Sequence, residues 1–417
     1  MLFPAVCHAS TVIDAGDTAW MLVATALVLM MSVPGLAMFY SGLVRTKNAL
    51  SIFIQCFAIV ALVSLLWMIA GYSLVFVDGG ANQAWIGGLT KSGLMGVSNG
   101  SVAGRIPEYL FFIFQMTFAA ITPALVIGGF AERIRFSAVL LFTVLWLFLV
   151  YVPVAHWVWG GGWLAKLGVM DFAGGLVVHV TAGSAALVCA LVVKKRRGFP
   201  EVSMPPHNLP LTAAGAGLLW MGWYGFNGGS ALTANGSAAA AILATHMSAS
   251  AGALSWMVIE WLKYRKPSVL GILTGMVAGL GTITPASGYV SPSAAIFIGL
   301  IAGAACFYAT QLVKRILHID DSLDVSPVHG AGGAVGTILT GLFASTQFGG
   351  TGFSVQHSIT AQLGVQLLAV IAVAGWCVLM TWLVLRVIAA TVGLRVTEEQ
   401  ETEGLDVASH GERGYSI

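Results

Sequence analysis

Two histidines, His179 and His329, stand inside long apolar stretches and have matching surroundings. An aspartate precedes each histidine by eight residues, Asp171 and Asp321 respectively, and an H-x-x-[AG]-G patch of small residues begins at each histidine. A neutral imidazole has one donor and one acceptor nitrogen, so two such rings can hydrogen-bond to each other and carry a proton. Polar groups at membrane depth are costly and by default face a cavity or a partner. The pattern predicts a paired histidine site between two related halves of a membrane protein.

The composition indicates a polytopic membrane protein. Of the 417 residues, 58% are hydrophobic and 9% are charged, whereas soluble domains are about 25% charged. The formal net charge of +2 gives no indication of a nucleic-acid partner. The five cysteines form no C-x-x-C pair, and four of them lie in apolar runs where cysteine behaves as a small hydrophobe. We therefore expect no disulfide, no metal site and no cofactor.

The histidines must be positioned by membrane-spanning helices, each of which needs about 20 predominantly apolar residues. We expect residues 1–17 to be a short extracytoplasmic segment, 18–390 a transmembrane domain and 391–417 a cytoplasmic tail. The tail is rich in Glu and Asp; it is either a solvated end or a regulatory docking element. Eleven candidate spans lie near residues 18–43, 49–76, 108–131, 137–154, 172–193, 209–230, 238–262, 269–285, 292–313, 327–345 and 361–389.

The distribution of positive charge predicts the orientation, because Lys and Arg accumulate in cytoplasmic loops. With the N-terminus outside, 16 of the 19 Lys and Arg residues fall on the inner side, and Lys91, Arg105 and Lys166 fall on the outer side. Eleven spans then place the C-terminus in the cytoplasm. The expected location is the cell inner (plasma) membrane, with multiple passes.

Two echoes along the chain predict inverted five-helix repeats, formed by spans 1–5 and 6–10, with span 11 outside the repeat. The histidine motif begins spans 5 and 10. The pattern G-x-x-x-F-x-x-G occurs in span 1 at Gly35–Phe39–Gly42 and in span 6 at Gly222–Phe226–Gly229. Repeats of this kind place the site near the membrane midplane, at the interface between the halves. The fold class we expect is an all-α polytopic membrane protein.

An ordered set of motifs extends over nearly the whole chain. It includes P-G-L-A-M-F-Y-S-G-L-V-R-T-K-N at 34–48, A-H-W-V-W-G-G-G at 155–162 and G-W-Y-G-F-N-G-G-S at 222–230. Together these segments resemble the ammonium transporter family (Amt, Mep and Rh proteins), and its bacterial-type members rather than the Rhesus branch. The remaining matching stretches are 128–138, 171–179, 206–210, 324–330 and the tail from 393 to 412.

The resemblance implies a homotrimer in which each protomer has its own pore for ammonium or ammonia. It also implies that a cytosolic PII-type signal protein docks on the inner face. Residue by residue, it assigns ammonium recruitment to Phe118, Trp159 and Ser230, and a gate to Phe118 and Phe226. It assigns the pore lining to His179 and His329, and a structural or electrostatic role to Asp171.

Each assigned role has a physical basis, and each residue also has a purely structural alternative. Aromatic faces attract a desolvating cation by about 2 kcal/mol or more, although Trp159 alone would read as an interfacial belt residue and Phe118 as core. A bare ion in an apolar channel has a large desolvation cost and neutral ammonia does not, which argues for deprotonation before passage. Asp171 begins span 5, where a carboxylate suits a helix N-terminus; it either organises the outer site or is an ordinary cap.

Several other residues are weaker candidates. Phe114 lies one helical turn from Phe118 and is a weak gate candidate. Trp223 and Tyr40 belong to matched motifs and are candidates for lining the pore. Thr274 aligns with a pore-wall hydroxyl of the family, and its alternative role is packing. We expect Asp321 and Asp324 to cap or shape the loop before span 10. Five further histidines at span edges or in loops are expected to be structural or surface residues; they are His156, His207, His246, His318 and His357.

Three rival functions remain. A non-transporting ammonium sensor on the same fold is expected to carry extra cytosolic signalling domains, and the tail of about 27 residues (391–417) argues against it. A membrane-embedded enzyme using two histidines as acid and base would need a wet cavity and a nucleophile or metal. A channel for another neutral molecule such as carbon dioxide would have no use for an outer cation site.

Overall fold

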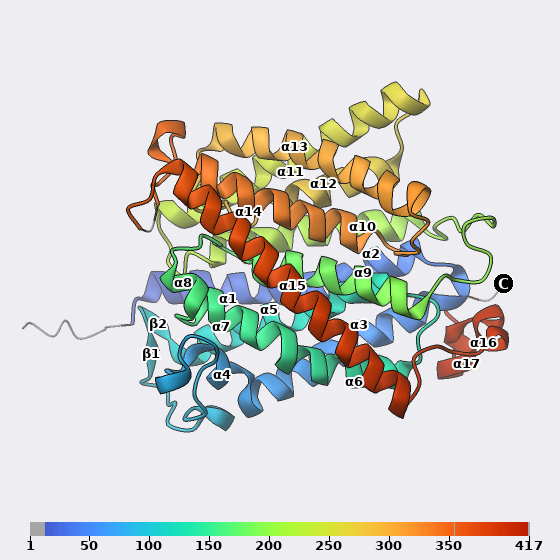
Figure 1. Ribbon diagram of the computed structural model, residues 1–417, viewed down its shortest axis with the longest axis horizontal. Helices are drawn as coiled ribbons and strands as arrows, with labels where there is room; N and C mark the ends of the chain where they lie inside the picture. Colours follow the sequence, from blue (N-terminus) through green and yellow to red (C-terminus); the bar gives the residue numbers. More distant parts are fainter. Residues whose placement is uncertain (1–12, 354, 416–417) are drawn as a thin grey trace, which may run out of the picture.

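The long apolar runs form helices that extend from one polar end of the molecule to the other (Figure 1). The computed structural model describes residues 13–353 and 355–415. Within these residues, eight helical segments are long and apolar enough to cross a membrane; they are Ala15–Leu43, Thr46–Phe76, Glu108–Gly129, Phe136–Lys166, Gly175–Val193, Gly236–Tyr264, Pro292–Ile316 and Ile359–Thr391. The all-α polytopic fold is therefore confirmed.

The other three predicted spans are also helical but shorter or interrupted, so the count of eleven crossings stays a prediction. They correspond to α10 with η9, to α12, and to η11 with α14, where η denotes a π- or 3₁₀-helical turn. Residues 1–12 of the predicted N-terminal segment lie outside the described residues.

The first half of the chain ends with the helix that carries His179. Its elements are α1 (Ala15–Met30), η1 (Met31–Leu36), α2 (Ala37–Leu43), η2 (Thr46–Asn48), α3 (Ala49–Leu66), η3 (Trp67–Gly71), α4 (Tyr72–Phe76), η4 (Gly80–Asn82), η5 (Ser92–Leu94), β1 (Val102–Ala103), β2 (Ile106–Pro107), α5 (Glu108–Val126), η6 (Ile127–Gly129), α6 (Phe136–Trp146), η7 (Leu147–Tyr151), α7 (Val152–Trp159), α8 (Trp163–Lys166), η8 (Gly175–Val180) and α9 (Thr181–Val193). The two short strands pair antiparallel.

The second half carries His329 and ends in two short tail helices. Its elements are α10 (Leu209–Trp223), η9 (Tyr224–Gly228), α11 (Gly236–Tyr264), α12 (Val269–Ile283), α13 (Pro292–Gln311), η10 (Leu312–Ile316), η11 (Ser326–Ala331), α14 (Gly332–Phe343), η12 (Thr346–Phe348), α15 (Ile359–Thr391), α16 (Glu398–Glu403) and α17 (Leu405–His410). Each histidine motif opens its helix with a π-helical turn, η8 in the first half and η11 in the second.

The fourth predicted span was placed too short. It was expected near 137–154, but the helical segment runs over Phe136–Lys166. Pro153 lies in the first turn of α7, directly after the π-helical turn η7. The backbone stays helical from η7 into α7, so the π-helical turn accommodates the N–H that proline lacks inside a continuing helix. The continuation places Trp159 at the end of α7, beyond the predicted end of the span.

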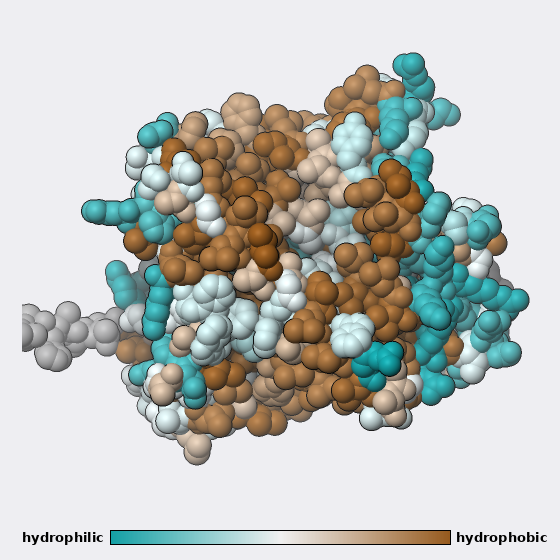
Figure 2. Space-filling view, viewed as in Figure 1, coloured by the Kyte–Doolittle hydropathy of each residue, from teal (hydrophilic) through white to brown (hydrophobic). Residues whose placement is uncertain are grey.

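The surface has the apolar and polar regions that a protein spanning a bilayer requires. A hydrophobic band covers the middle of the molecule, and hydrophilic side chains gather at its two ends (Figure 2). The tail helices α16 and α17 lie at the end opposite to β1, β2 and α8 (Figure 1). The described chain thus starts at one polar end and finishes at the other, as an odd number of crossings requires.

Candidate functional site

A vestibule opens at the end of the molecule that carries α8. Its volume is about 290 Å³, and its walls include Phe118, Trp159 and Ser230. Ser230 Oγ donates to the carbonyl of Phe226 at 2.7 Å. Because that bond uses the only hydroxyl proton, the Ser230 oxygen can act only as an acceptor toward the vestibule. Aromatic faces and an acceptor oxygen are the groups that would bind a small cation with N–H donors.

Two phenylalanine rings close the floor of this vestibule. The centroids of Phe118 and Phe226 are 4.2 Å apart with an interplanar angle of 39°, and each side chain is 1% exposed. The Trp159 ring stands edge-on to Phe118 at 5.9 Å. Phe114 packs behind Phe118 with a centroid distance of 5.0 Å and is fully buried. It supports the pair from the side and lies outside the vestibule lining.

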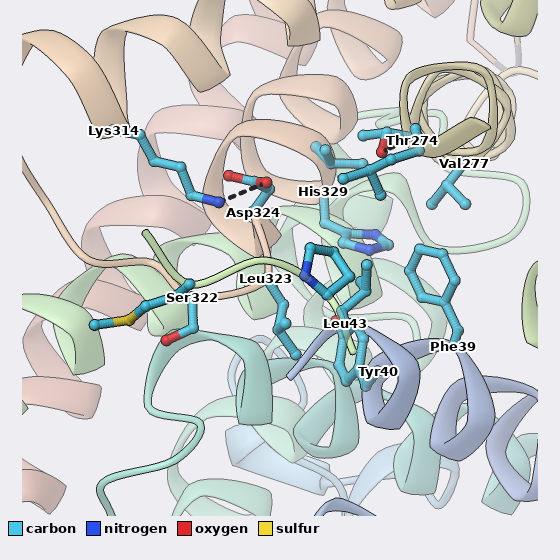
Figure 3. Close-up of a pocket in the computed structure, with 14 residues that line it drawn as sticks. Phe39, Tyr40, Leu43, Thr274, Val277, Lys314, Ser322, Leu323, Asp324 and His329 are labelled. Carbon is cyan, nitrogen blue, oxygen red and sulfur yellow. Dashed lines mark hydrogen bonds and ion pairs between the residues drawn. The ribbon is translucent and has the colours of Figure 1, made fainter. Parts of the chain in front are cut away.

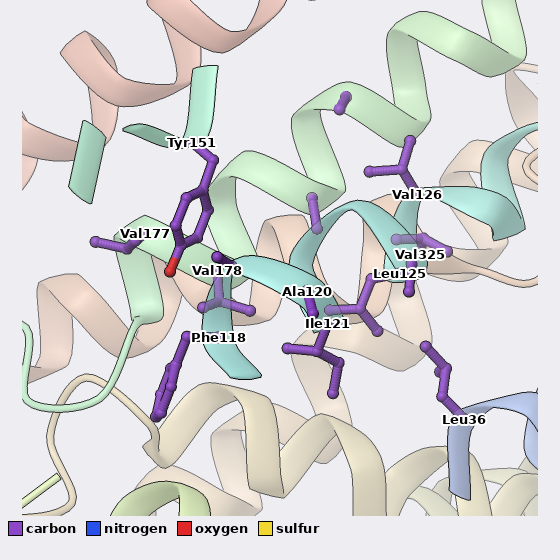
Figure 4. Close-up of a cluster of buried hydrophobic side chains, with 14 of the residues drawn as sticks. Leu36, Phe118, Ala120, Ile121, Leu125, Val126, Tyr151, Val177, Val178 and Val325 are labelled. Carbon is purple, nitrogen blue, oxygen red and sulfur yellow. The ribbon is translucent and has the colours of Figure 1, made fainter. Parts of the chain in front are cut away.

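A narrow apolar passage lies beyond the rings. It has room for only about 10 Å³ of water-sized solvent, which is close to the smallest volume that holds one water molecule. Figure 4 shows side chains of its wall, among them Leu36, Ile121, Leu125 and Val178. Among the described residues that line it, the polar atoms come from His179, His329 and the indole of Trp223.

The two histidines meet inside this passage. His179 Nδ1 and His329 Nδ1 are 3.2 Å apart, and the ring centroids are 5.2 Å apart. The approach depends on glycines, because a Cβ on Gly183 would lie 2.2 Å from Gly330 Cα. Real Cβ atoms do not come that close, so only glycine at 183 lets α9 and η11 cross at this distance. The small-residue patch that follows each histidine in the sequence is therefore part of the crossing.

The hydroxyl of Thr284 determines which nitrogen of His179 carries the proton. Thr284 Oγ1 donates its only proton to the Leu280 carbonyl at 2.8 Å and accepts from Trp223 Nε1 at 2.9 Å. His179 Nε2 is 3.3 Å from the same oxygen and must be the donor of that contact. His179 Nδ1 is then an acceptor, His329 Nδ1 is its donor, and His329 Nε2 carries a free lone pair.

Asp171 connects the vestibule to the helix that carries His179. Its carboxylate accepts four backbone N–H bonds, from Gly174, Gly175, Leu176 and Val177, at 2.6–3.3 Å. Its backbone carbonyl accepts from Trp159 Nε1 at 3.0 Å. The carboxylate is 5% exposed and is not among the groups that line the vestibule. One residue therefore holds both the first turn of η8 and the Trp159 ring.

A second vestibule lies on the other side of the histidines (Figure 3). Its volume is about 200 Å³, and its walls include His329, Tyr40, Thr274 and Asp324. Asp324 pairs with Lys314 at 2.8 Å. Asp321 accepts from the backbone N–H and the hydroxyl of Ser326, at 2.6 and 2.7 Å, and so caps η11 as expected.

A buried ion-pair network joins the loops at this end. Glu132 is fully buried and binds Arg196 Nη1 at 2.5 Å and Arg45 Nε at 2.9 Å. Burial alone would raise the pKa of Glu132, but the two guanidinium groups lower it to about 2. Asn48 donates to Glu132 at 2.7 Å and accepts from the Leu405 N–H at 2.8 Å. The network therefore reaches the tail.

The tail packs on the loops of its own chain. The Asp406 carboxylate accepts from the N–H groups of Leu50 and Ser51 at 3.0 and 2.7 Å, in the first turn of α3. Glu401 accepts from the Arg197 N–H at 2.7 Å and pairs with Arg395 at 2.6 Å. Two acidic residues of the tail, Glu401 and Asp406, therefore hold it against the loops of its own chain.

The structure thus brings the predicted residues into one line: Phe118, Trp159 and Ser230, then Phe226, then His179 and His329. Thr284 and the vestibule residue Gln115 were missed by sequence reasoning. Thr284 ends an apolar span without a motif, and Gln115 offers only its spacing from Phe118. His156 is fully buried, with its ring nitrogens 2.8 Å from two backbone carbonyls, in keeping with a structural role.

Comparison with known proteins agrees with the motifs. A relative named ammonium transporter from Bacillus subtilis (strain 168) is 46% identical over 403 residues, which cover 96% of this chain and 98% of the relative. The crystal structure of Saccharomyces cerevisiae Mep2 matches with a TM-score of 0.82 and 38% identity, over 93% of this chain and 91% of that chain. A structure described as a sensor Amt protein matches with a TM-score of 0.87 and 31% identity, over 95% of this chain and 98% of that one.

The family match extends over nearly the whole molecule. The model of the Ammonium Transporter Family covers residues 19–415, which include both vestibules, the paired histidines and the tail helices. The resemblance found from the motifs is thereby confirmed, and so is a multi-pass membrane protein. The chain belongs to the ammonium transporter family.

Proposed function

We propose that the protein recruits ammonium at Phe118, Trp159 and Ser230, deprotonates it, and conducts ammonia past Phe226 along His179 and His329. The observation that carries this proposal is the arrangement of two vestibules separated by an apolar passage whose polar atoms come largely from the two imidazoles. An aromatic site for a cation leads directly into a passage suited only to a neutral molecule.

The dimensions of the passage favour ammonia over the ion. An ion that enters a space of about 10 Å³ must leave its hydration shell behind, and unpaired burial of a charge costs far more than burial of a neutral polar group. Ammonia can donate to an imidazole lone pair and accept from an N–H, so the histidines replace part of its hydration. The proton released in the outer vestibule is then routed separately from ammonia.

The proposal extends to the orientation and assembly of the protein in the membrane. We propose that the vestibule with Trp159 faces the outside and that residues 391–417 form a cytoplasmic tail, since Arg and Lys gather at the tail end. The transmembrane domain comprises residues 18–390 and assembles as a homotrimer in the inner membrane. Asp171 acts on the outer site by holding Trp159 and η8, and not by contacting ammonium.

Trp159→Leu is expected to weaken recruitment, because one cation–π wall is lost. A loss of about 2 kcal/mol corresponds to a rise of roughly 30-fold in the apparent KM for ammonium. Concentration-dependent uptake of methylammonium into proteoliposomes measures it. Trp85→Leu is the matched control, because Trp85 is 59% exposed at the same end and does not line the vestibule. An unchanged KM for Trp159→Leu would remove Trp159 from the site.

A sensor on the same fold is the second candidate, because a structure described as a sensor Amt protein is among the close matches. Both functions use the outer site, but only a transporter passes substrate. Proteoliposomes with an imposed ammonium gradient separate them: transport gives internal alkalinisation or current, and a sensor gives binding without either.

Deletion of residues 397–417 is expected to lower uptake or alter binding of a PII-type partner, while leaving the trimer intact. The deletion removes the caps that Asp406 gives α3 and the Glu401 bonds to the 194–197 loop. Uptake, co-purification of PII from membranes and native mass measure the three outcomes. Normal values for uptake and PII binding in the truncated protein would leave the tail as a solvated end.

A further inference from the structure

Two glutamines are buried in α15, the long helix that lies outside the predicted repeat. Gln362 and Gln366 are both 0% exposed. A primary amide in an apolar helix is costly unless its donors and acceptor are paired. An apolar residue at either position would suit a membrane helix better, so the amides call for a physical reason.

Gln366 has every hydrogen-bonding position filled. Its Oε1 accepts from the Met170 N–H at 2.9 Å and from Gln362 Nε2 at 3.3 Å. Its Nε2 donates to the Met170 carbonyl at 2.8 Å and to the Thr337 carbonyl at 2.9 Å. The Gln366 side chain therefore hydrogen-bonds both the N–H and the carbonyl of Met170 and links Met170 to Thr337 of α14.

Gln362 hydrogen-bonds the same backbone segment at Gly168. Its Nε2 donates to the Gly168 carbonyl at 3.0 Å, and His357 Nδ1 lies 2.9 Å from its Oε1. From the other side of the segment, the Phe172 N–H donates to the Pro285 carbonyl at 3.0 Å. The stretch from 168 to 172 is thus held on both flanks, and α15 supplies most of the side-chain bonds.

Met170, which Gln366 binds, is adjacent in the chain to Asp171, which organises the outer vestibule. Met170 precedes Asp171, whose carbonyl accepts from Trp159 Nε1 and whose carboxylate caps η8. A shift of Met170 would move the adjoining Asp171, whose carbonyl is the acceptor of the Trp159 indole, and the ring would move with it. The path from Gln366 to the vestibule wall passes through two adjacent backbone residues, Met170 and Asp171, with hydrogen bonds at each end.

We propose that Gln366 is a positioning residue for ammonium recruitment: it fixes the 170–171 backbone and thereby sets the orientation of the Trp159 ring toward the cation. The inference rests on the proposed function of the outer site. In this proposal α15, which crosses the face of the bundle beside α14 (Figure 1), helps to position the outer site. Gln362 plays the same part with fewer bonds to the segment.

The test is the uptake kinetics of Gln366→Met, which keeps the length of the side chain and removes all four bonds. The apparent KM for methylammonium is expected to rise about fivefold, with a maximal rate per assembled protein within twofold of the wild type. Thr381→Val is the matched control. Thr381 is buried in the same helix and accepts from Trp146 Nε1 at 3.0 Å, far along the chain from the 168–172 contacts. Its KM is expected to stay unchanged.

A double variant separates positioning from general loosening. In a Trp159→Leu background, Gln366→Met is expected to add less than a twofold rise in KM, because coupled residues are not additive. Full additivity, or an unchanged KM for Gln366→Met alone while Trp159→Leu raises it, would overturn the inference. An unchanged KM for Trp159→Leu would instead contradict the proposed recruitment site, whatever Gln366→Met does.

A milder variant covers the case in which Gln366→Met does not assemble. Gln362→Met removes the Gly168 bond and leaves the Met170 bonds in place. Its KM is expected to rise about twofold, with hydrogen–deuterium exchange faster in the 168–172 backbone than in wild type. Faster exchange there with no change in KM would overturn the proposal, since the segment would then be loosened without any effect on recruitment.

Discussion

Asp171→Ala is expected to abolish ammonium transport. The substitution removes the acceptor of four backbone N–H groups at the start of η8, and each buried donor left unpaired costs about 1–3 kcal/mol. The turn that carries His179 and the peptide that binds Trp159 would both shift. Uptake by proteoliposomes, normalised to correctly assembled protein on a sizing column, measures the effect.

Two further variants interpret the result. Asp171→Glu is expected to retain part of the activity, because a carboxylate remains within reach of some of the N–H groups. Asp14→Ala removes a helix cap together with a surface ion pair, since Asp14 accepts from the Asp17 N–H at 2.9 Å at the start of α1 and pairs with the exposed Arg105 at 2.6 Å; such caps are worth about 1 kcal/mol. If assembled Asp171→Ala transported as well as Asp14→Ala, Asp171 would be only a cap.

Replacing either pore histidine by alanine is expected to lower substrate flux or to admit larger hydrated ions. Each variant removes one imidazole from a passage that has little other polar lining. The loss of one hydrogen bond, about 1.4 kcal/mol, corresponds to roughly a tenfold fall in flux. The double variant is expected to be non-additive with the single ones, because His179 and His329 are in direct contact.

Flux and ion selectivity measured in parallel distinguish the outcomes. Methylammonium uptake reports the flux, and currents carried by potassium or sodium report the leak. Thr340→Val is the matched control: Thr340 is a buried threonine of α14 that bonds only the Gly336 carbonyl of its own helix, at 2.8 Å. Wild-type flux and selectivity in both single variants and the double variant would refute the twin-histidine mechanism.

The residues of the site could be predicted because they carry strong chemical contrast with their surroundings. His179, His329 and Asp171 are polar groups in apolar runs, and their repeated spacing indicated two related halves. Phe118, Trp159, Ser230 and Phe226 came from the resemblance to the family, because an aromatic residue in an apolar helix is otherwise indistinguishable from core. Gln366 belonged to no motif, and nothing in its sequence neighbourhood points to Met170, almost 200 positions earlier.

The sequence by itself determined the fold class, most span positions and the identity of the chemical groups, because hydrophobicity over about 20 residues is a local property. It could not determine the end of the fourth span, where a π-helical turn accommodates Pro153. Only the tertiary structure decided that Gly183 and Gly330 let two helices cross closely enough for the imidazoles to bond. Only the tertiary structure, likewise, places Thr284 where it orients His179 and lets Gln366 of α15 hydrogen-bond the backbone of Met170. These are contacts between residues far apart in the chain, and their geometry depends on packing that no local pattern encodes.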